Sequence, residues 1–140
     1  MIQFIYNELK PKGLKVRKAK QAILIIFKQS KKTLGDLNYI FCTDEYLLKL
    51  NQDYLKHDTY TDIITFDLSS SASIINGEIY ISVDRVIENA KNLKIKTEHE
   101  FARVVFHGAL HLCGYKDKTK SEISQMRLKE EEFLQYYLKP

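Results

Sequence analysis

Two histidines four residues apart, His107 and His111, stand shortly before Gly114 and constrain the fold of this chain more than any other feature. Residues 97–100 (TEHE) match a capping box, which opens a helix, and apolar residues recur after it at helical spacing. Gly114 can adopt the left-handed conformation that ends a helix. Side chains four apart on a helix share one face, so both imidazoles can reach one ion. The pattern predicts a helix over residues 97–114 with two metal ligands near its end.

A third ligand follows the glycine. The turn after Gly114 can fold Asp117 back toward the two imidazoles. Three protein ligands leave a coordination position open for water or substrate, which is typical of catalytic rather than structural zinc. We therefore expect one Zn²⁺ per chain, or another divalent ion, held by His107, His111 and Asp117, which are also the predicted catalytic residues. A bare HxxxH pair more often indicates core histidines, but Gly114 and Asp117 weaken that alternative.

The same spacing resembles the metzincin proteases, in which two helical histidines and a ligand beyond a glycine hold zinc. Those proteases place a glutamate, the general base, directly after the first histidine, whereas this chain has Gly108 there. A glycine has no side chain that could accept a proton. The zincin-like helix therefore keeps its ion site, disfavours peptidase activity and favours another hydrolysis in which the ion activates water.

Two further side chains near this helix are poor candidates for the ion. Cys113 follows His111 by two residues, roughly 200° around the helix, so it should point away and pack in the interior. His99 lies two turns before His107, about 12 Å along the helix axis, too far to share the ion. We expect His99 to lie at the surface.

The rest of the chain predicts one α+β domain over residues 1–140 with a small mixed sheet of about four strands. No repeat, low-complexity tract or linker divides the chain. Asp84 should cap the third helix, and Ile123, Met126, Phe133 and Tyr137 should form the buried face of the last. The strands are expected at residues 3–6, 37–42, 62–67 and 77–83, and the helices at residues 14–29, 43–55, 84–93, 97–114 and 121–137. The apolar run at residues 22–27 could also form a strand.

The charge of the chain is uneven. The net charge is +4, and residues 1–32 contain nine Lys or Arg against one acid, Glu8. Such a segment favours a polyanion such as RNA, although a solvated lysine-rich helix face explains it equally well. The N-terminus does not match a secretory leader, and the best apolar run, Ala22–Phe27, is too short to cross a bilayer. We expect a cytoplasmic protein with free thiols and no membrane partner.

A second polar cluster lies where the helix ending near residue 55 gives way to the strand at residues 62–67. Asp58, Thr59, Thr61 and Asp62 can contact substrate or simply build a turn, and both interpretations remain open. Lys56 and His57 are available to bind phosphate.

Three segments together resemble the YbeY family of rRNA maturation endoribonucleases. HGALHLCGYKD at residues 107–117 matches the family signature HGxLHLxGYDH. LNQDYL and TDIITF match the family patterns LNxxYR and TDVLSF, and GEIYIS at residues 77–82 matches a GDI-type strand. The matches cover about half of the chain in the family's order.

The resemblance implies a single-strand-acting, metal-dependent endoribonuclease in rRNA maturation, at the 16S rRNA 3′ end, and in ribosome quality control. The implied partners are ribosomal RNA and the small subunit, with a ribosomal protein or an assembly GTPase as further candidates. His107 and His111 carry over directly as ligands, and Asp117 carries over by position, because the family has its third histidine there. The alternative is an assembly factor with a structural metal and no nuclease activity.

Two departures from the family bear on the chemistry. Asp117 replaces a neutral ligand with an anionic one, which lowers the charge of the site and makes the ion a weaker electrophile. The family's arginine after Tyr54 is Leu55 here, so a phosphate contact is missing. Lys56, His57 or Arg85 would then supply the positive charge.

Overall fold

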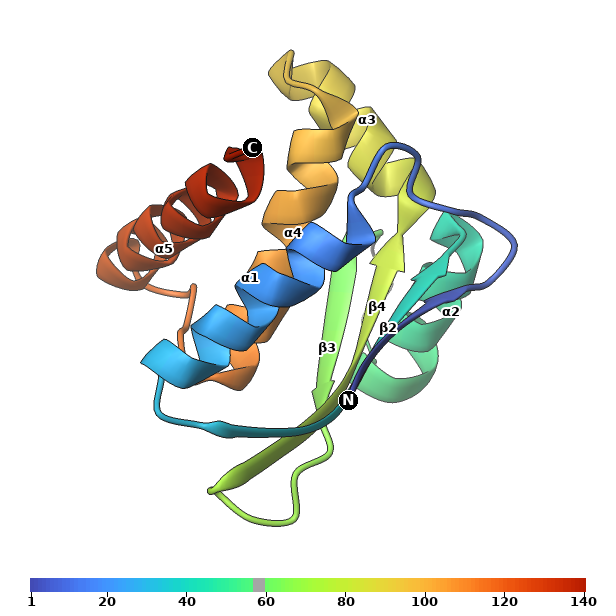
Figure 1. Ribbon diagram of the computed structural model, residues 1–140. Coiled ribbons are helices and arrows are strands. Elements are labelled where there is room, and N and C mark those ends of the chain that lie inside the picture. The colour runs from blue at the N-terminus through green and yellow to red at the C-terminus, as the bar shows by residue number, and fades with distance from the viewer. Residues whose placement is uncertain (57–59) are drawn as a thin grey trace.

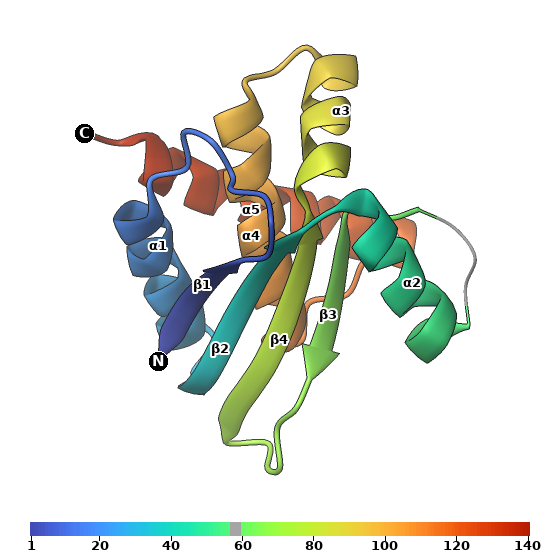
Figure 2. The same ribbon diagram turned by 90° about the vertical axis from the view of Figure 1, so that its right-hand side faces the viewer.

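A four-stranded sheet forms the middle layer of the computed structural model, which describes residues 1–56 and 60–140 (Figure 1). Helices α1 and α4 cover one face of the sheet, α5 packs on α1 and α4, and α2 lies against the other face (Figure 2). The elements are β1 (Ile2–Tyr6), α1 (Val16–Gln29), β2 (Thr33–Cys42), α2 (Asp44–Leu55), β3 (Ile63–Asp67), β4 (Ile74–Ser82), α3 (Val83–Leu93), α4 (Thr97–Leu112) and α5 (Lys120–Leu138). The predicted α+β class is confirmed.

The sheet has the order β1-β2-β4-β3 and is mixed, as predicted. Strands β1, β2 and β4 are parallel, with Phe4 paired to Tyr39 and Tyr39 paired to Ile79. Strand β3 runs antiparallel to β4 and forms the edge of the sheet beside α4. The topology therefore places the end of β3 next to the helix that carries the two histidines.

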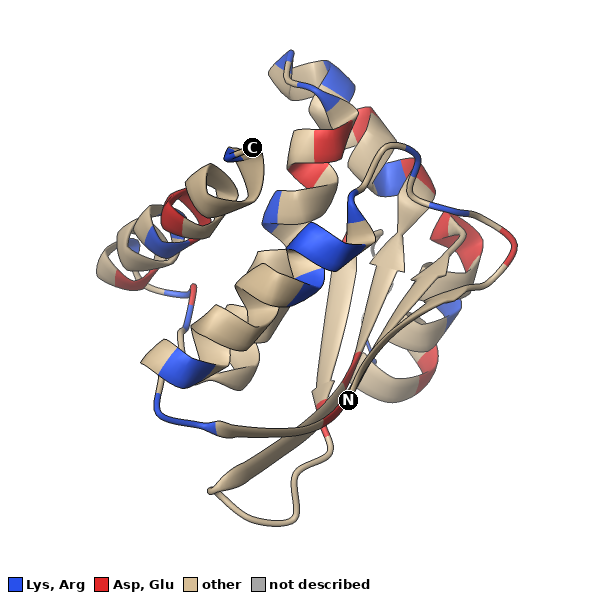
Figure 3. Ribbon diagram, viewed as in Figure 1, with Lys and Arg blue, Asp and Glu red and all other residues tan. Residues whose placement is uncertain are grey.

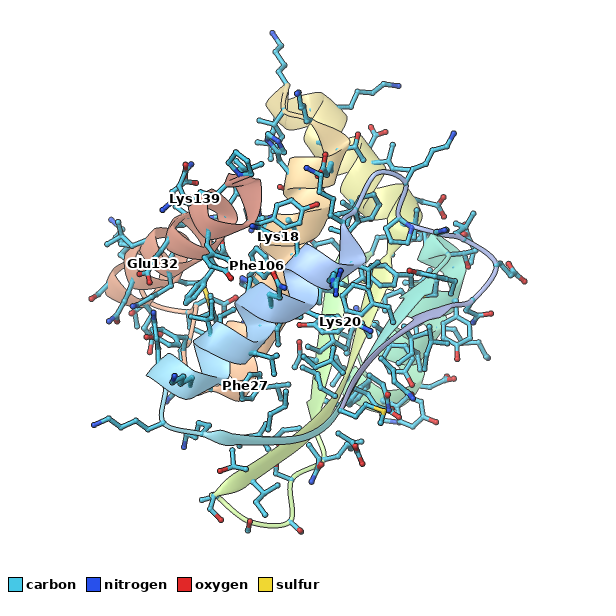
Figure 4. All side chains as sticks on the ribbon, in the orientation of Figure 1. Lys18, Lys20, Phe27, Phe106, Glu132 and Lys139 are labelled. Atoms are coloured by element: carbon cyan, nitrogen blue, oxygen red, sulfur yellow. The ribbon has the colours of Figure 1, made fainter. Side chains whose placement is uncertain are left out.

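The main core lies between the sheet and helices α1, α4 and α5. Alternate residues of β2 and β4 face it, because successive side chains of a strand point to opposite faces. The hydroxyl of Tyr39 donates to the Val105 carbonyl at 2.7 Å and fixes α4 against the sheet. Figure 4 shows Phe27 on α1 and Phe106 on α4, and both rings are fully buried. This packing holds α4 in place along most of its length.

Two strands are longer than the sequence pattern suggests. Strand β2 begins at Thr33 rather than residue 37, and β4 begins at Ile74 rather than residue 77, because Thr33 pairs with Ile74 and Leu34 with Ile75. A shift in register between Leu34 and Leu37 interrupts the pairing. That irregularity hides the strand starts from a simple alternation rule.

Two helix caps were assigned to the wrong residues. The capping box expected at residues 97–100 does not form: Lys96 is the N-cap of α4, without a side-chain cap, and Glu100 is buried and paired with Arg103. Helix α3 is capped by the Ser82 side chain, which accepts from the Arg85 backbone N–H, and not by Asp84. Pattern rules fail here because both acids have partners on other elements or inside the helix.

One residue predicted to be buried is exposed: Ile123 lies in the first turn of α5 and is 43% exposed. Tyr54, near the end of α2, is 67% exposed. Tyr54 still packs edge-on against Phe66, with ring centroids 6.1 Å apart. The true start of α5 is a capping box formed by Thr119 and Glu122.

The two cysteines are free thiols, as expected, with Cys42 buried and Cys113 half-buried. His99 is partly buried rather than fully at the surface. Within residues 1–56 and 60–140, no helix combines the length and the apolar character that crossing a membrane requires.

Candidate metal centre

The last two turns of α4 and the loop that follows bring the three predicted ligands together. Their candidate ligand atoms, on His107, His111 and Asp117, all lie within 4.8 Å of one another. One carboxylate oxygen, Oδ2 of Asp117, is 3.1 Å from His111 Nε2 and 3.4 Å from His107 Nε2. The two rings are nearly perpendicular, with centroids 4.6 Å apart. The group could hold one metal ion.

The donor set suits zinc. Two imidazoles and a carboxylate are ligands that Zn²⁺ accepts, and a three-ligand set leaves a coordination position for water or substrate. His107 is 17% exposed and Asp117 is 40% exposed, so the cluster is partly accessible to solvent. The identity of the ion depends on more than this donor set, because imidazole and carboxylate also bind other divalent metals.

Glu130 on α5 supports the first histidine from behind. Its Oε2 lies 2.5 Å from Nδ1 of His107, and its side chain is only 2% exposed. Burial alone would raise the pKa of Glu130, but the hydrogen bond with His107 and the charge of Arg103 hold it below its usual value. The ionised carboxylate accepts from Nδ1–H of His107 and leaves the Nε2 lone pair for an ion. Such a partner behind a metal-binding histidine fixes both tautomer and ring direction.

Glu130 is itself held by two arginines. Arg103 Nη1 is 3.0 Å from Glu130 Oε1, and Arg127 Nη1 is 3.2 Å from the same oxygen. Arg103 also binds the fully buried Glu100 through two nitrogens, at 2.8 and 2.5 Å. Although burial lowers the pKa of Arg103, its bonds to Glu100 and the nearby Glu130 charge raise it overall, so it stays protonated. The charged groups compensate one another in the interior.

Sequence reasoning missed Glu130 and Arg103, although a signal was present. Glu130 falls on the buried stripe of α5 between Met126 and Phe133, where a carboxylate requires a partner. Arg103 lies four residues before His107 and therefore on the same side of α4. Only the packing of α4 against α5 shows that these residues meet.

A pocket of about 930 Å³ opens in front of the cluster. Its walls come from α4 and the following loop, from the β3 edge, from the end of α2 and from the exposed side of α5. The lining includes His107, His111, Asp117, Asp62, Asp67, Leu55, Tyr60, Lys118 and Arg127. The pocket is large enough to admit part of a polymeric substrate beside the predicted ligands.

The second polar cluster contributes to this pocket through Thr61 and Asp62. The Thr61 hydroxyl donates to the Ile63 carbonyl at 3.3 Å, and Asp62 accepts from the Asn89 side chain at 3.5 Å. Burial raises the pKa of Asp62, while the charges of Arg103 and His107 oppose that rise. These two residues thus both shape the turn and line the pocket. Residues 57–59, and with them His57, Asp58 and Thr59, lie outside the described residues.

The other predicted phosphate contacts have different surroundings. Lys56 is the exposed C-cap of α2 in a left-handed conformation, with φ 58°. Arg85 Nη2 lies 2.7 Å from Asp44 Oδ2, and its guanidinium lies over the Tyr60 ring, 4.9 Å from the centroid. The hydrogen bond to Asp44 raises the pKa of Arg85. Much of the Arg85 charge is therefore compensated, and its phosphate contact stays a prediction.

Comparison with known proteins gives one consistent result. The family model described as "Endoribonuclease YbeY" matches residues 5–138. A protein of that name from Porphyromonas gingivalis is 54% identical over 103 residues, which cover 74% of this chain and 68% of the relative. The one from Flavobacterium psychrophilum is 53% identical over 106 residues, covering 76% and 75%. A solution structure from Thermotoga maritima aligns with a TM-score of 0.71 at 29% identity, over 98% of this chain and 89% of that chain.

Proposed function

Because this chain belongs to the endoribonuclease YbeY family, we propose that it is a metal-dependent endoribonuclease that cleaves single-stranded RNA. Its proposed substrate is precursor ribosomal RNA at the 16S 3′ end, in the cytoplasm. The small subunit, a ribosomal protein or an assembly GTPase would be its partners, and ribosome quality control would use the same activity. The observation that carries the proposal is the cluster of His107, His111 and Asp117 at the mouth of a large pocket.

The side chains present suit hydrolysis of a phosphodiester. A divalent ion bound by the cluster would lower the pKa of a water molecule and polarise a phosphoryl oxygen. His107 is oriented for that purpose by Glu130, and Asp117 adds an anionic ligand that reduces the charge of the site. Gly108 offers no carboxylate for peptide hydrolysis, so the described site favours RNA over peptide chemistry.

The proposal predicts that cleavage requires both the ion and the histidine pair. Purified protein stripped of metal should not cut a single-stranded RNA that spans the 16S 3′ end, and Zn²⁺ should restore cutting. His111→Ala should lower the rate at least about 100-fold, because it removes one of three ligands. The measurement is the rate of product formation on a sequencing gel, beside the ion content of each sample.

His99→Ala is the matched control, since His99 lies on the same helix outside the cluster and the substitution is the same. It should retain wild-type cleavage. Cleavage by the stripped protein at the wild-type rate would contradict metal dependence. Absence of cleavage from every loaded sample, with co-sedimentation on small-subunit particles and earlier melting without metal, would favour an assembly factor with a structural ion.

A further inference from the structure

We infer that Arg127 on α5 is a substrate-binding residue that contacts the RNA phosphate at the metal centre. The inference rests on the proposed function for its substrate class and adds a residue that the sequence motifs do not indicate. Basic residues occur on α1, between α3 and α4, and on α5 (Figure 3), so the pocket wall decides which of them can reach the site.

The charge of the pocket points to a basic residue close to the metal centre. Among the described residues that line it, Lys118 and Arg127 are the two permanent cations, whereas Asp62, Asp67 and Asp117 are acids. A divalent ion at the cluster would offset part of this negative charge, and a further cation close by would stabilise a phosphodiester that lies beside the remaining carboxylates. In the described part of the pocket, Lys118 and Arg127 are the residues that can supply that cation.

The Arg127 guanidinium is available to bind a ligand. Its side chain is 62% exposed, and within the described residues it makes one hydrogen bond, from Nη1 to Glu130 Oε1 at 3.2 Å. A guanidinium carries five N–H donors in a planar fork that matches two phosphate oxygens. Most of the donors of Arg127 are therefore left for a ligand.

Arg127 is held in place by Glu130. Glu130 accepts from Arg127 and, through its other oxygen, from His107. One buried carboxylate thus positions both a pocket cation and a predicted metal ligand. Lys118 lies in the loop before α5 and lacks such an anchor among the described ion pairs. A preorganised group on a helix loses less freedom on binding than a loop lysine.

The end of α2 forms part of the opposite wall of the pocket. Leu55 lines the same pocket at the end of α2 and offers no charge to a phosphate. Of the predicted substitutes in the described part of the chain, neither Lys56 nor Arg85 lines the pocket, and Arg85 is already bound to Asp44. Arg127 supplies from α5 the positive charge that the α2 side of this pocket lacks.

The test compares Arg127→Gln with Arg17→Gln, which removes the same charge from an exposed position on α1. Zinc-loaded Arg127→Gln should cleave a short single-stranded RNA with kcat/KM about 10- to 100-fold below wild type. Arg127→Lys should recover part of the loss, because it keeps the charge without the fork. Arg17→Gln should match the wild type on this short substrate.

A binding measurement separates this inference from the nuclease assignment. Fluorescence anisotropy with a single-stranded oligodeoxynucleotide, across salt concentrations, reports phosphate contacts without RNA cleavage. Arg127→Gln should reduce the slope of log affinity against log salt by about 0.7, the value for one phosphate contact on a single strand. The zinc content and melting temperature of the variant should match those of the wild type, because Glu130 keeps its contacts with Arg103 and His107.

The outcomes are distinct. If Arg127→Gln keeps wild-type kcat/KM and salt slope, the inference is overturned, and a loss in Lys118→Gln alone would move the phosphate contact to Lys118. If the wild type binds the oligonucleotide but never cleaves RNA, the proposed function fails. A reduced slope in Arg127→Gln would still support the phosphate contact in that case.

Discussion

Glu130 is the residue through which the candidate site connects to the rest of the fold. It contacts His107, Arg103 and Arg127, three side chains from two helices, and it is almost fully buried. A metal-binding imidazole binds best when its second nitrogen is held by an acceptor. The strength of ion binding should therefore depend on a residue that touches no ion.

Glu130→Gln should weaken zinc binding about 10- to 100-fold, because an amide is a poorer acceptor and brings an N–H₂ group toward Arg103. Competition with a chromophoric chelator at fixed pH measures the affinity. Ring ¹⁵N shifts of His107 report its tautomer without any activity assay. Glu131→Gln, one position further on the exposed side of α5, is the control, and equal affinities for both variants would contradict the role of Glu130.

The clustering of the three candidate ligands could be predicted because they lie within 11 residues of one another on a helix and its following turn. Local geometry alone brings His107, His111 and Asp117 together. Glu130 and Arg103 could not be found in this way, since their meeting depends on how α5 lies across α4. A charged residue on an apolar stripe indicates a buried partner without identifying it.

At the scale of elements, the contact between α4 and the sheet depends on Gly108. A Cβ at this position would lie 2.8 Å from Cδ1 of Ile79 and 3.1 Å from Cδ1 of Ile63, closer than packed carbons normally approach. The absent side chain lets the histidine helix lie directly on β4 and β3. The residue that argues against protease chemistry thus also has a packing role.

Gly108→Ala should lower the free energy of unfolding by about 1–2 kcal/mol, because overpacking outweighs the gain in helix propensity. Urea denaturation measures the change. Ile79→Val removes the Cδ1 atom nearest to the new methyl group, so the double variant should be more stable than the sum of the two single changes implies. Strict additivity would show that the close approach is relieved elsewhere.

Most helices, and their first residues to within two positions, followed from apolar periodicity, but two of their caps did not. The predicted capping box at residues 97–100 is wrong because Glu100 turns inward to Arg103. Asp84 was wrongly assigned as a cap, because its carboxylate accepts from the Asp44 backbone N–H while Ser82 caps α3. Cap rules treat a helix end in isolation, whereas α2 and α3 begin side by side at the ends of β2 and β4 and exchange partners.

At the scale of the whole molecule, the strand order β1-β2-β4-β3 lay beyond sequence analysis. Strands β3 and β4 are consecutive in the chain and pair antiparallel, but the insertion of β4 between β2 and β3 depends on long-range packing. This strand order places β2 and β4 in the centre of the sheet. Cys42 at the end of β2 is consequently inaccessible to solvent.

This burial gives the stability of the molecule an alkaline limit. Burial, and then the charges of Asp44 and Asp84, raise the pKa of Cys42 from 9.0 to about 12. Between these values the unfolded chain loses a proton that the folded chain keeps, so stability is full below pH 9 and falls as pH rises toward 12. The contribution is about 1.4 kcal/mol per pH unit at most.

Cys42→Ser should remove that contribution while retaining a donor for the Ile81 carbonyl. Urea denaturation of the metal-free, reduced protein at several pH values from 8 to 11 measures it. The unfolding free energy of the variant should fall less steeply with pH than that of the wild type. Parallel curves would show that the thiol is not protected by burial.

The contact between His107 and Glu130 has a consequence for the synthesis of the protein on the ribosome. Every predicted ligand of the ion has been translated by residue 117, yet the carboxylate that contacts the first of them, His107, follows 13 positions later, on α5. A nascent chain halted between these points carries an unsupported site. Until α5 has been translated and packed on α4, the predicted ligand His107 lacks the carboxylate that orients it.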